Sequence, residues 1–236
     1  MVSRTAEQYL KLVLSLEGGE EPIMTRLAAI LGVTPASVTG MVKRLAAQGL
    51  LLHQAYGGIS LTPEGRDIAV RLLRRHRIAE LYLYEKLNFP LHLVHDEADA
   101  LEHHMSDYLE ERMASALSST VFDPHGHPIP SADGALREFE GITLKDAQVD
   151  DEMTVTCVPD HDALFLKHLV EIDCTPGKRI TVIEHNTGAS TVTFRLGHKE
   201  HSISLPKAKE ICVCRNDSEQ ANCFTDFINN LQNGVN

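Results

Sequence analysis

Two short helical segments, a glycine turn and a glycine-centred hairpin follow one another within residues 24–61, and this order restricts the fold more than any other feature. The segment 24–31 ends at Gly32, and Thr34-Pro35 then supplies an N-cap and a first-turn proline for the next helix. Two β-rich runs follow and meet at Gly57-Gly58. The pattern predicts a winged helix-turn-helix, since a compact helical bundle explains the helices but not the hairpin.

The second helix of this pair, residues 35–47, has an apolar face and an opposite face of small, hydroxyl and basic side chains. In helix-turn-helix proteins this helix enters the major groove of DNA. Small side chains at its start allow a close approach to the bases, and basic side chains bind phosphates. We therefore expect double-stranded DNA as a partner, contacted by Arg26, Thr34, Pro35, Ala36, Ser37, Thr39, Gly40, Lys43 and Arg44.

Helices are also expected on both sides of this segment. Residues 7–16 are apolar enough for a largely buried first helix, and a long helix begins at Thr62-Pro63. This long helix continues through Leu81-Tyr82-Leu83-Tyr84, which offers more apolar surface than one small domain needs. Such surface favours a homodimer interface, although core packing explains it nearly as well.

Six potential metal ligands lie on the end of the long helix and on a further helical stretch between residues 95 and 103. Because residues three and four apart share one face of a helix, these side chains form pairs that point the same way. Taken singly, each has a simpler explanation as a solvated carboxylate or a hydrogen-bonded imidazole. Together they favour one or two cations held between two packed helices: His76, Glu80, His95, Asp99, Glu102 and His103.

The C-terminal half changes character. Residues 131–150 read as a polar linker, and short apolar runs separated by turn residues begin at Met153. These runs predict a small β-barrel of five strands at 154–158, 177–183, 191–196, 201–205 and 211–213, with one helix near 163–170. The expected class is therefore α+β, with domains at 1–74, 75–130 and 151–214, the linker at 131–150 and a tail, 215–236, that hints at an amphipathic helix.

Charge and cysteine content restrict the location and the partners. Residues 1–77 carry ten Lys or Arg and six Asp or Glu, a net of +4, which leaves −15 for the remainder of the total of −11. A mildly basic N-terminal unit beside an acidic body suits a DNA reader coupled to a cation sensor. No apolar run of about 18 residues and no secretion signal is present, so we expect a cytoplasmic protein with no membrane partner. The five scattered cysteines favour reduced thiols.

Several motifs together resemble the diphtheria toxin repressor family of metal-dependent regulators. The resemblance covers roughly residues 3–213 and rests on these segments: Thr5-Ala6-Glu7-Gln8-Tyr9-Leu10, Ser37-Val38-Thr39-Gly40-Met41-Val42, Leu61-Thr62-Pro63-Glu64-Gly65, Arg75-His76-Arg77, His95 to His103, Met105-Ser106-Asp107 and Pro124 to Pro130. It implies a homodimer with a winged helix, a helical dimerisation and metal-binding domain and an SH3-like barrel. Metal occupancy would favour binding to a palindromic operator and repression of metal-uptake genes.

The resemblance also implies two divalent cations per subunit. A primary site would fall on Gln8, Asp99, Glu102 and His103, and a second on His76, Glu80 and His95, completed from the barrel by Asp160 or Asp162. The iron-responsive branch carries Met and Cys where this chain has Gln8 and Asp99. Oxygen and nitrogen donors favour Mn²⁺, so manganese is the expected metal and Fe²⁺ the alternative.

An enzyme is the rival interpretation, in which the same cluster activates water as a metal-dependent hydrolase. The sequence contains no nucleophile motif, no phosphate-binding glycine loop and no cofactor fingerprint, and we expect neither an enzyme nor a small organic substrate. Two other signals have structural explanations. We expect His125 and His127 to shape a loop, and Cys212 and Cys214 to lie on one face of a strand.

Overall fold

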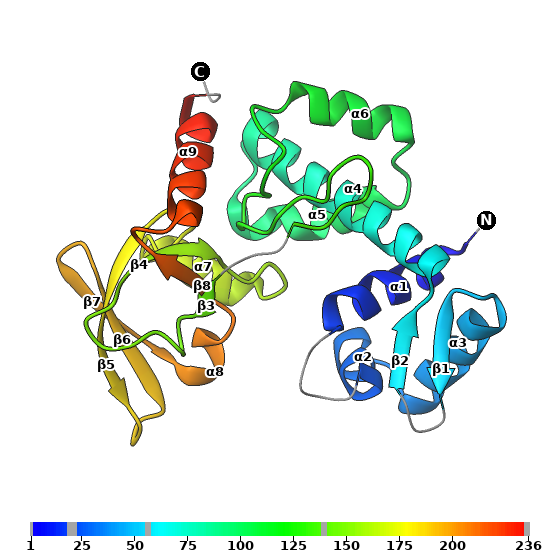
Figure 1. Ribbon diagram of the computed structural model, residues 1–236, viewed down its shortest axis with the longest axis horizontal. Coiled ribbons are helices and arrows are strands. Elements are labelled where there is room, and N and C mark those ends of the chain that lie inside the picture. Colours follow the sequence, from blue (N-terminus) through cyan, green and yellow to red (C-terminus); the bar gives the residue numbers. More distant parts are fainter. Residues whose placement is uncertain (1, 18–22, 55–57, 138–140, 234–236) are drawn as a thin grey trace. The chain divides into compact units, whose positions relative to one another are not determined.

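The computed structural model describes residues 2–17, 23–54, 58–137 and 141–233. It divides into two compact units (Figure 1). The first contains residues 1–75 and 130–136, and the second contains residues 76–129 and 137–236. The first unit has one hydrophobic core, and the second unit has two, one in its helical part and one in its sheet domain.

The first unit has the helices and the hairpin that the sequence predicts. Helix α1 (Arg4–Leu16) begins at the N-cap Ser3, α2 spans Ile23–Leu31, and α3 (Pro35–Ala47) begins at Thr34, whose hydroxyl accepts the Ser37 amide. Strands β1 (Leu51–Gln54) and β2 (Gly58–Leu61) pair antiparallel, and α4 (Pro63–Leu87) follows. The winged helix-turn-helix is confirmed, while Gly57 of the expected turn lies outside the described residues.

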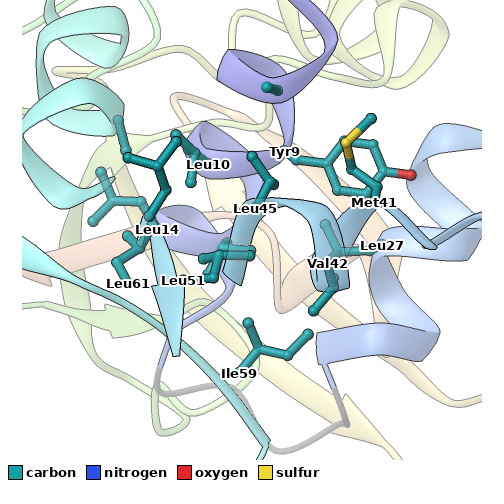
Figure 2. Packing of buried hydrophobic residues seen from close by; sticks show 14 of the residues in the cluster. Tyr9, Leu10, Leu14, Leu27, Met41, Val42, Leu45, Leu51, Ile59 and Leu61 are labelled. Atoms are coloured by element: carbon teal, nitrogen blue, oxygen red, sulfur yellow. The ribbon is translucent and has the colours of Figure 1, made fainter. Parts of the chain in front are cut away.

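Apolar side chains from every element of the first unit meet in one core (Figure 2). Leu10 of α1, Leu27 of α2 and Leu45 of α3 are fully buried there. Gly65 locks α4 against the wing, because a Cβ at this position would lie 2.0 Å from the carbonyl oxygen of Leu50. The tight packing leaves the outer face of α3 free of any role in the core.

The helical part of the second unit surrounds the C-terminal half of α4. It contains the short 3₁₀ turn η1 (Leu91–Leu93), α5 (Val94–Glu102) and α6 (Asp107–Ala116), which begins at the N-cap Ser106. Buried Ile78, Ala98 and Phe122 belong to its core. This core fixes one face of α4 toward α5, which is where the expected metal ligands lie.

The rest of the second unit is an SH3-like domain with a six-stranded antiparallel sheet in the order β3-β8-β4-β5-β6-β7. Its elements are β3 (Ile142–Thr143), β4 (Glu152–Cys157), α7 (Ala163–Glu171), β5 (Arg179–Asn186), β6 (Thr191–Leu196), β7 (Lys199–Ser204), α8 (Leu205–Ala208) and β8 (Cys212–Arg215).

Part of the expected linker 131–150 belongs to this sheet domain. Strand β3 pairs with β8, and the side chains of Leu144 and Ala147 are buried in the core of the domain. A strand of two residues is too short to give an alternating pattern, so the polar residues around it led to the prediction of a linker. The five expected strands therefore become six.

The expected amphipathic helix of the tail is present as α9 (Glu219–Asn233), and its apolar side chains are buried. The expectation of reduced thiols was wrong for one pair. Cys157 and Cys212 face each other across β4 and β8 and form a disulfide, while Cys174, Cys214 and Cys223 are free. Sequence spacing gave no sign of the pair, because strand register decides which cysteines meet.

In the part of the chain that the structure describes, no single helix is long and apolar enough to cross a membrane. One bent pair, α2 with α3, satisfies the length and composition criteria.

Candidate metal centre

The centre is built around His76, which faces two groups of ligands through its two ring nitrogens. On one side, His76 Nε2 lies 3.0 Å from Glu80 Oε1, one helical turn further along α4. From α5, His95 Nδ1 approaches the same carboxylate oxygen to 3.1 Å. His76 and Glu80 are almost fully buried, so their mutual contacts replace the water that ionisable side chains normally bind.

On its other side, His76 meets the carboxylates of α5. Its Nδ1 lies 2.8 Å from Glu102 Oε2 and 3.3 Å from Asp99 Oδ1. His103 Nε2 lies 3.3 Å from the second oxygen of Glu102. The structure thus brings together Asp99, Glu102 and His103, while the fourth expected ligand, Gln8, lies half-buried on α1 in the first unit.

The sheet domain contributes Asp160 to the first of these groups. One ligand atom each from His76, Glu80, His95 and Asp160 lies within 4.8 Å of the others. The loop after β4 is held in place because the Val158 amide donates to the carbonyl oxygen of His125 over 3.0 Å.

Asp162, the other expected ligand from this domain, lies elsewhere. Its carboxylate caps α7 by accepting the Phe165 amide at 3.0 Å, and it also accepts a hydrogen bond from Lys207 at 2.8 Å. A residue that opens a helix directs its oxygens back to that helix, and this explains why Asp160 rather than Asp162 joins the cluster.

The sequence reasoning missed a third group next to the first one. Ligand atoms of Asp123, His125 and His127 lie within 4.8 Å of one another, and His125 Nδ1 is 3.6 Å from Glu80 Oε1. Asp160 Oδ2 lies 3.8 Å from His127 Nδ1. The sequence predicts that these histidines shape a loop, and His125 Nε2 indeed lies 3.1 Å from the carbonyl oxygen of Leu91. An aspartate two and four residues before two histidines was the signal available.

Some polar atoms of the third group are satisfied within the loop, since Asp123 Oδ1 accepts the amides of His125 and His127 at 2.9 Å each. Among the described residues, Asp123 Oδ2, His125 Nδ1, His127 Nδ1 and Glu80 Oε2 are buried atoms without a hydrogen-bond partner. Buried orphan atoms are costly and uncommon in native proteins. Four such atoms lie in this cluster, and a cation would be a partner for them, although Asp123 Oδ2 also lies 3.3 Å from His127 Nδ1 and 3.5 Å from Arg77 Nε.

The electrostatics of the cluster lead to the same conclusion. Burial acts to lower the pKa of His76, but the Glu80 charge and hydrogen bonds to Asp99 and Glu102 raise it well above its ordinary value. Burial is likewise outweighed at His125, whose pKa rises to about 9 beside Glu80. The carboxylates of this centre therefore favour positive charge beside them, and a divalent cation would supply that charge in place of the histidine protons.

The donor set fits a divalent cation of intermediate hardness. Imidazole nitrogens and carboxylate oxygens surround His76, and no thiolate or thioether belongs to the three groups found among the described residues. Such ligands suit Mn²⁺ and Fe²⁺, whereas a sulfur-rich site would favour softer metals.

The expected DNA-contacting residues share one surface of the first unit. Thr34, Pro35, Ala36, Ser37, Gly40, Lys43 and Arg44 are exposed on or just before α3, and Arg26 and Thr39 are half-buried. A Cβ on Gly40 would meet no atom within 4 Å, so packing inside the unit does not require glycine there.

Comparison with known families covers most of the chain. Residues 1–59 match the N-terminal DNA-binding domain of iron-dependent repressors, and residues 62–131 match their metal-binding and dimerisation domain. Residues 142–215 match the FeoA domain. Helix α9 lies beyond these ranges.

Individual relatives agree with the family models. The diphtheria toxin repressor of Corynebacterium efficiens is 37% identical over 53% of this chain and 55% of its own length, so the chain matches little more than half of that relative. The iron-dependent repressor IdeR of Mycobacterium tuberculosis is 35% identical over 86% of this chain and 92% of its own length.

Solved structures give the same answer. A manganese-dependent transcriptional repressor in complex with manganese has a TM-score of 0.82 and 31% identity, and the match covers 89% of this chain and 99% of that one. The manganese regulator SloR has a TM-score of 0.77 and 28% identity over 89% of this chain and 98% of its own.

Proposed function

Because the chain belongs to the iron-dependent repressor family, we propose that it is a transcriptional repressor whose binding to operator DNA requires divalent cations. The observation that carries this proposal is the buried cluster around His76, on the same helix that leaves the wing of the winged helix-turn-helix. The family consists of DNA-binding regulators, and the rival hydrolase interpretation finds no support in it.

The two faces of His76 separate the proposed sites. Asp99, Glu102 and His103, with Gln8 from α1, would hold the first cation. The second cation would be held by His76, Glu80, His95 and Asp160. We add His125 and Asp123 as neighbours of the second cation, since His125 lies 3.6 Å from Glu80 and both residues carry unsatisfied buried atoms.

We propose Mn²⁺ as the activating metal and Fe²⁺ as the alternative. The oxygen and nitrogen donors of the cluster support this choice. Two relatives in the solved structures are named as manganese regulators, and other relatives are named iron-dependent repressors. A bound cation would offset the mutual repulsion of the clustered carboxylates.

The proposed mechanism is a linkage between metal and DNA. Gln8 lies on α1 of the winged helix, and its partner ligands Asp99 and Glu102 lie on α5. Gln8 together with Asp99 and Glu102 would hold one ion, and the shared ligation would favour a single orientation of the DNA-reading unit. Metal and operator must then raise each other's affinity by the same factor.

The DNA interface is proposed on the exposed residues of α3. Thr34 and Ser37 have short hydroxyl side chains and Gly40 has none, which would allow the helix to approach the bases closely. Lys43 and Arg44 carry charges for the phosphates. The family's dimerisation domain at residues 62–131 supports a homodimer. A two-fold dimer reads a palindromic operator with half-sites about one helical turn or more apart.

The test uses operator DNA selected from fragmented genomic DNA and titrated with protein in Mn²⁺ or in chelator. Glu102→Ala and His103→Ala are expected to abolish the Mn²⁺-dependent gain in DNA affinity while the far-ultraviolet circular dichroism stays that of the wild type. Arg195→Ala is the matched control, since Arg195 lies on β6 and pairs with Glu200. A normal gain in the Glu102 and His103 variants would contradict the site assignment.

A further inference from the structure

Among the described residues of the second unit, α9 is the one helix that lies beyond the ranges matched by the family models. It follows β8 after three residues, and the turn is anchored where Thr154 of β4 donates a hydrogen bond to Asn216 Oδ1 over 2.7 Å. The Ser218 hydroxyl then caps the helix by accepting the Ala221 amide. Figure 1 shows α9, in red, leaving the sheet domain directly from its last strand.

The apolar face of α9 is buried in the helical metal-binding part of the unit. The ring of Phe224 stacks on Phe122 with centroids 4.0 Å apart, and Phe227 meets the same ring edge-on at 5.5 Å. Leu231 joins the same core, which also contains Ile78 of α4. Phe122 directly precedes Asp123, so α9 packs against the base of the loop that carries the third ligand group.

The same helix also packs against the sheet domain. Ile228 covers Gly177, where an added Cβ would lie 2.8 Å from Ile228 Cγ1. Helix α9 therefore contacts both parts that contribute to the cluster. The sheet domain contributes Asp160, and the helical part contributes His76, Glu80 and His95.

We infer that α9 is a clamp that holds the sheet domain in the position from which Asp160 reaches the metal centre, and that it thereby sets the cation affinity of that centre. The inference rests on the proposed function for the part that concerns metal. A site that needs ligands from two bodies binds metal with an apparent affinity reduced by the fraction of molecules in which those bodies are docked. The clamp keeps that fraction close to one.

Apolar burial carries the docking. Phe224 is fully buried, Phe227 is 4% exposed and Leu231 is 8% exposed, although they belong to a helix whose other positions are mostly in water. Aromatic pairs in stacked and edge-on geometry contribute beyond the area that they bury. Replacing the two phenylalanines removes both ring contacts with Phe122 and changes no proposed ligand.

The test uses the full chain with Phe224→Ala and Phe227→Ala together. The control carries Asn229→Ala and Asn230→Ala, two exposed positions of the same helix. A further variant, Phe224→Leu with Phe227→Leu, restores apolar volume and is expected to recover much of the wild-type behaviour.

The first readout needs no metal. The Val158 amide, which donates to the His125 carbonyl oxygen, reports on docking, and the Val182 amide, which donates to Asp151, reports on the sheet domain itself. In chelator, the alanine pair is expected to speed hydrogen exchange at Val158 and leave Val182 protected. Unchanged exchange at Val158, or equal acceleration at both amides, would overturn the clamp.

The second readout is a Mn²⁺ titration against a competing chelator. The alanine pair is expected to weaken the site that contains Asp160 by about tenfold or more and to leave the other site unchanged. Faster exchange at Val158 with unaltered Mn²⁺ affinity would uphold the docking role of α9, but it would refute both Asp160 as a ligand and the control of cation affinity by α9. The failure of the clamp and the failure of the proposed function are therefore separate results.

Discussion

Two buried glutamates on α4 provide a test of the metal centre, because Glu80 faces histidine side chains and Glu85 faces the loop at Ser118. Glu80 is fully buried beside His76, His95 and His125, and its Oε2 has no hydrogen-bond partner among the described residues. Glu85 is 3% exposed and accepts hydrogen bonds from the amide and the hydroxyl of Ser118 at 3.0 and 2.6 Å. We expect Glu80→Gln to remove metal binding at its site and Glu85→Gln to spare it.

The size of the effect follows from binding linkage. At a free Mn²⁺ concentration of about 100 times the dissociation constant, one bound ion stabilises the folded state by about 2.7 kcal/mol. For a protein of this size that corresponds to a rise in Tm of roughly 5–11 °C. If Glu80→Gln weakens the site about 100-fold, the stabilisation falls to about 0.4 kcal/mol and the rise to roughly 1–2 °C.

The assay is thermal unfolding of each variant in Mn²⁺ and in chelator, and the quantity compared is the difference between the two Tm values. This difference cancels any direct effect of the substitution on the fold. Glu85→Gln is expected to lower Tm in both conditions, since hydrogen bonds to a charged group contribute about 1.5–3 kcal/mol. Its Mn²⁺-dependent difference stays that of the wild type. If the Mn²⁺-dependent difference in Tm of Glu80→Gln equals that of the wild type, the assignment of Glu80 as a ligand is refuted.

Three further perturbations are expected to give equally defined results. Asp99→Cys introduces a thiolate and is expected to shift activation from Mn²⁺ toward Zn²⁺ in operator binding, and unchanged relative responses would sink the ligand argument. Lys43→Ala is expected to reduce the slope of log affinity against log salt by about 1.8 for a dimer, because each of its two Lys43 side chains contributes about 0.9. Operator titration at several salt concentrations measures this slope, and an unaltered slope would remove Lys43 from the phosphate contacts. Cys157→Ala with Cys212→Ala is expected to lower the free energy of unfolding of the sheet domain by up to about 4 kcal/mol, because the disulfide closes a loop with a sequence separation of 55; an equal denaturant midpoint would contradict this.

The helix boundaries of the first unit could be predicted from the sequence, because they depend on neighbouring residues. Thr34 and Pro35 mark the start of α3 by capping and by a preset backbone angle, and the structure starts the helix at Pro35. The pairing of His76 with Glu80 was equally accessible, since i and i+4 positions share a helix face.

Features that depend on how distant segments pack or pair could not be predicted from the sequence. Asp160 and Asp162 are alike in sequence, and only the start of α7 decides that Asp162 is a cap. The Cys157–Cys212 disulfide depends on how β4 and β8 align. Periodicity indicated which side of α9 is apolar, but it carried no information on which core would accept that side.

The ligand role proposed for Asp123 and His125 was missed for a related reason. Their segment is rich in proline and glycine, which reads as loop chemistry. Gly126 shows that the loop is indeed constrained, with a φ of 95° and no room for a Cβ against the carbonyl oxygen of Thr156. The loop is therefore constrained in its backbone and also carries the proposed ligands. Only the buried atoms without hydrogen-bond partners point to the ligand role.

Control of operator binding by metal is tested most directly by capture of fragmented genomic DNA with the purified protein at fixed salt, in Mn²⁺ or in chelator, followed by sequencing. We expect enrichment of palindromic sites upstream of metal-uptake genes with Mn²⁺ and none with chelator. Equal enrichment in both conditions, or no enrichment in either, would contradict control by metal.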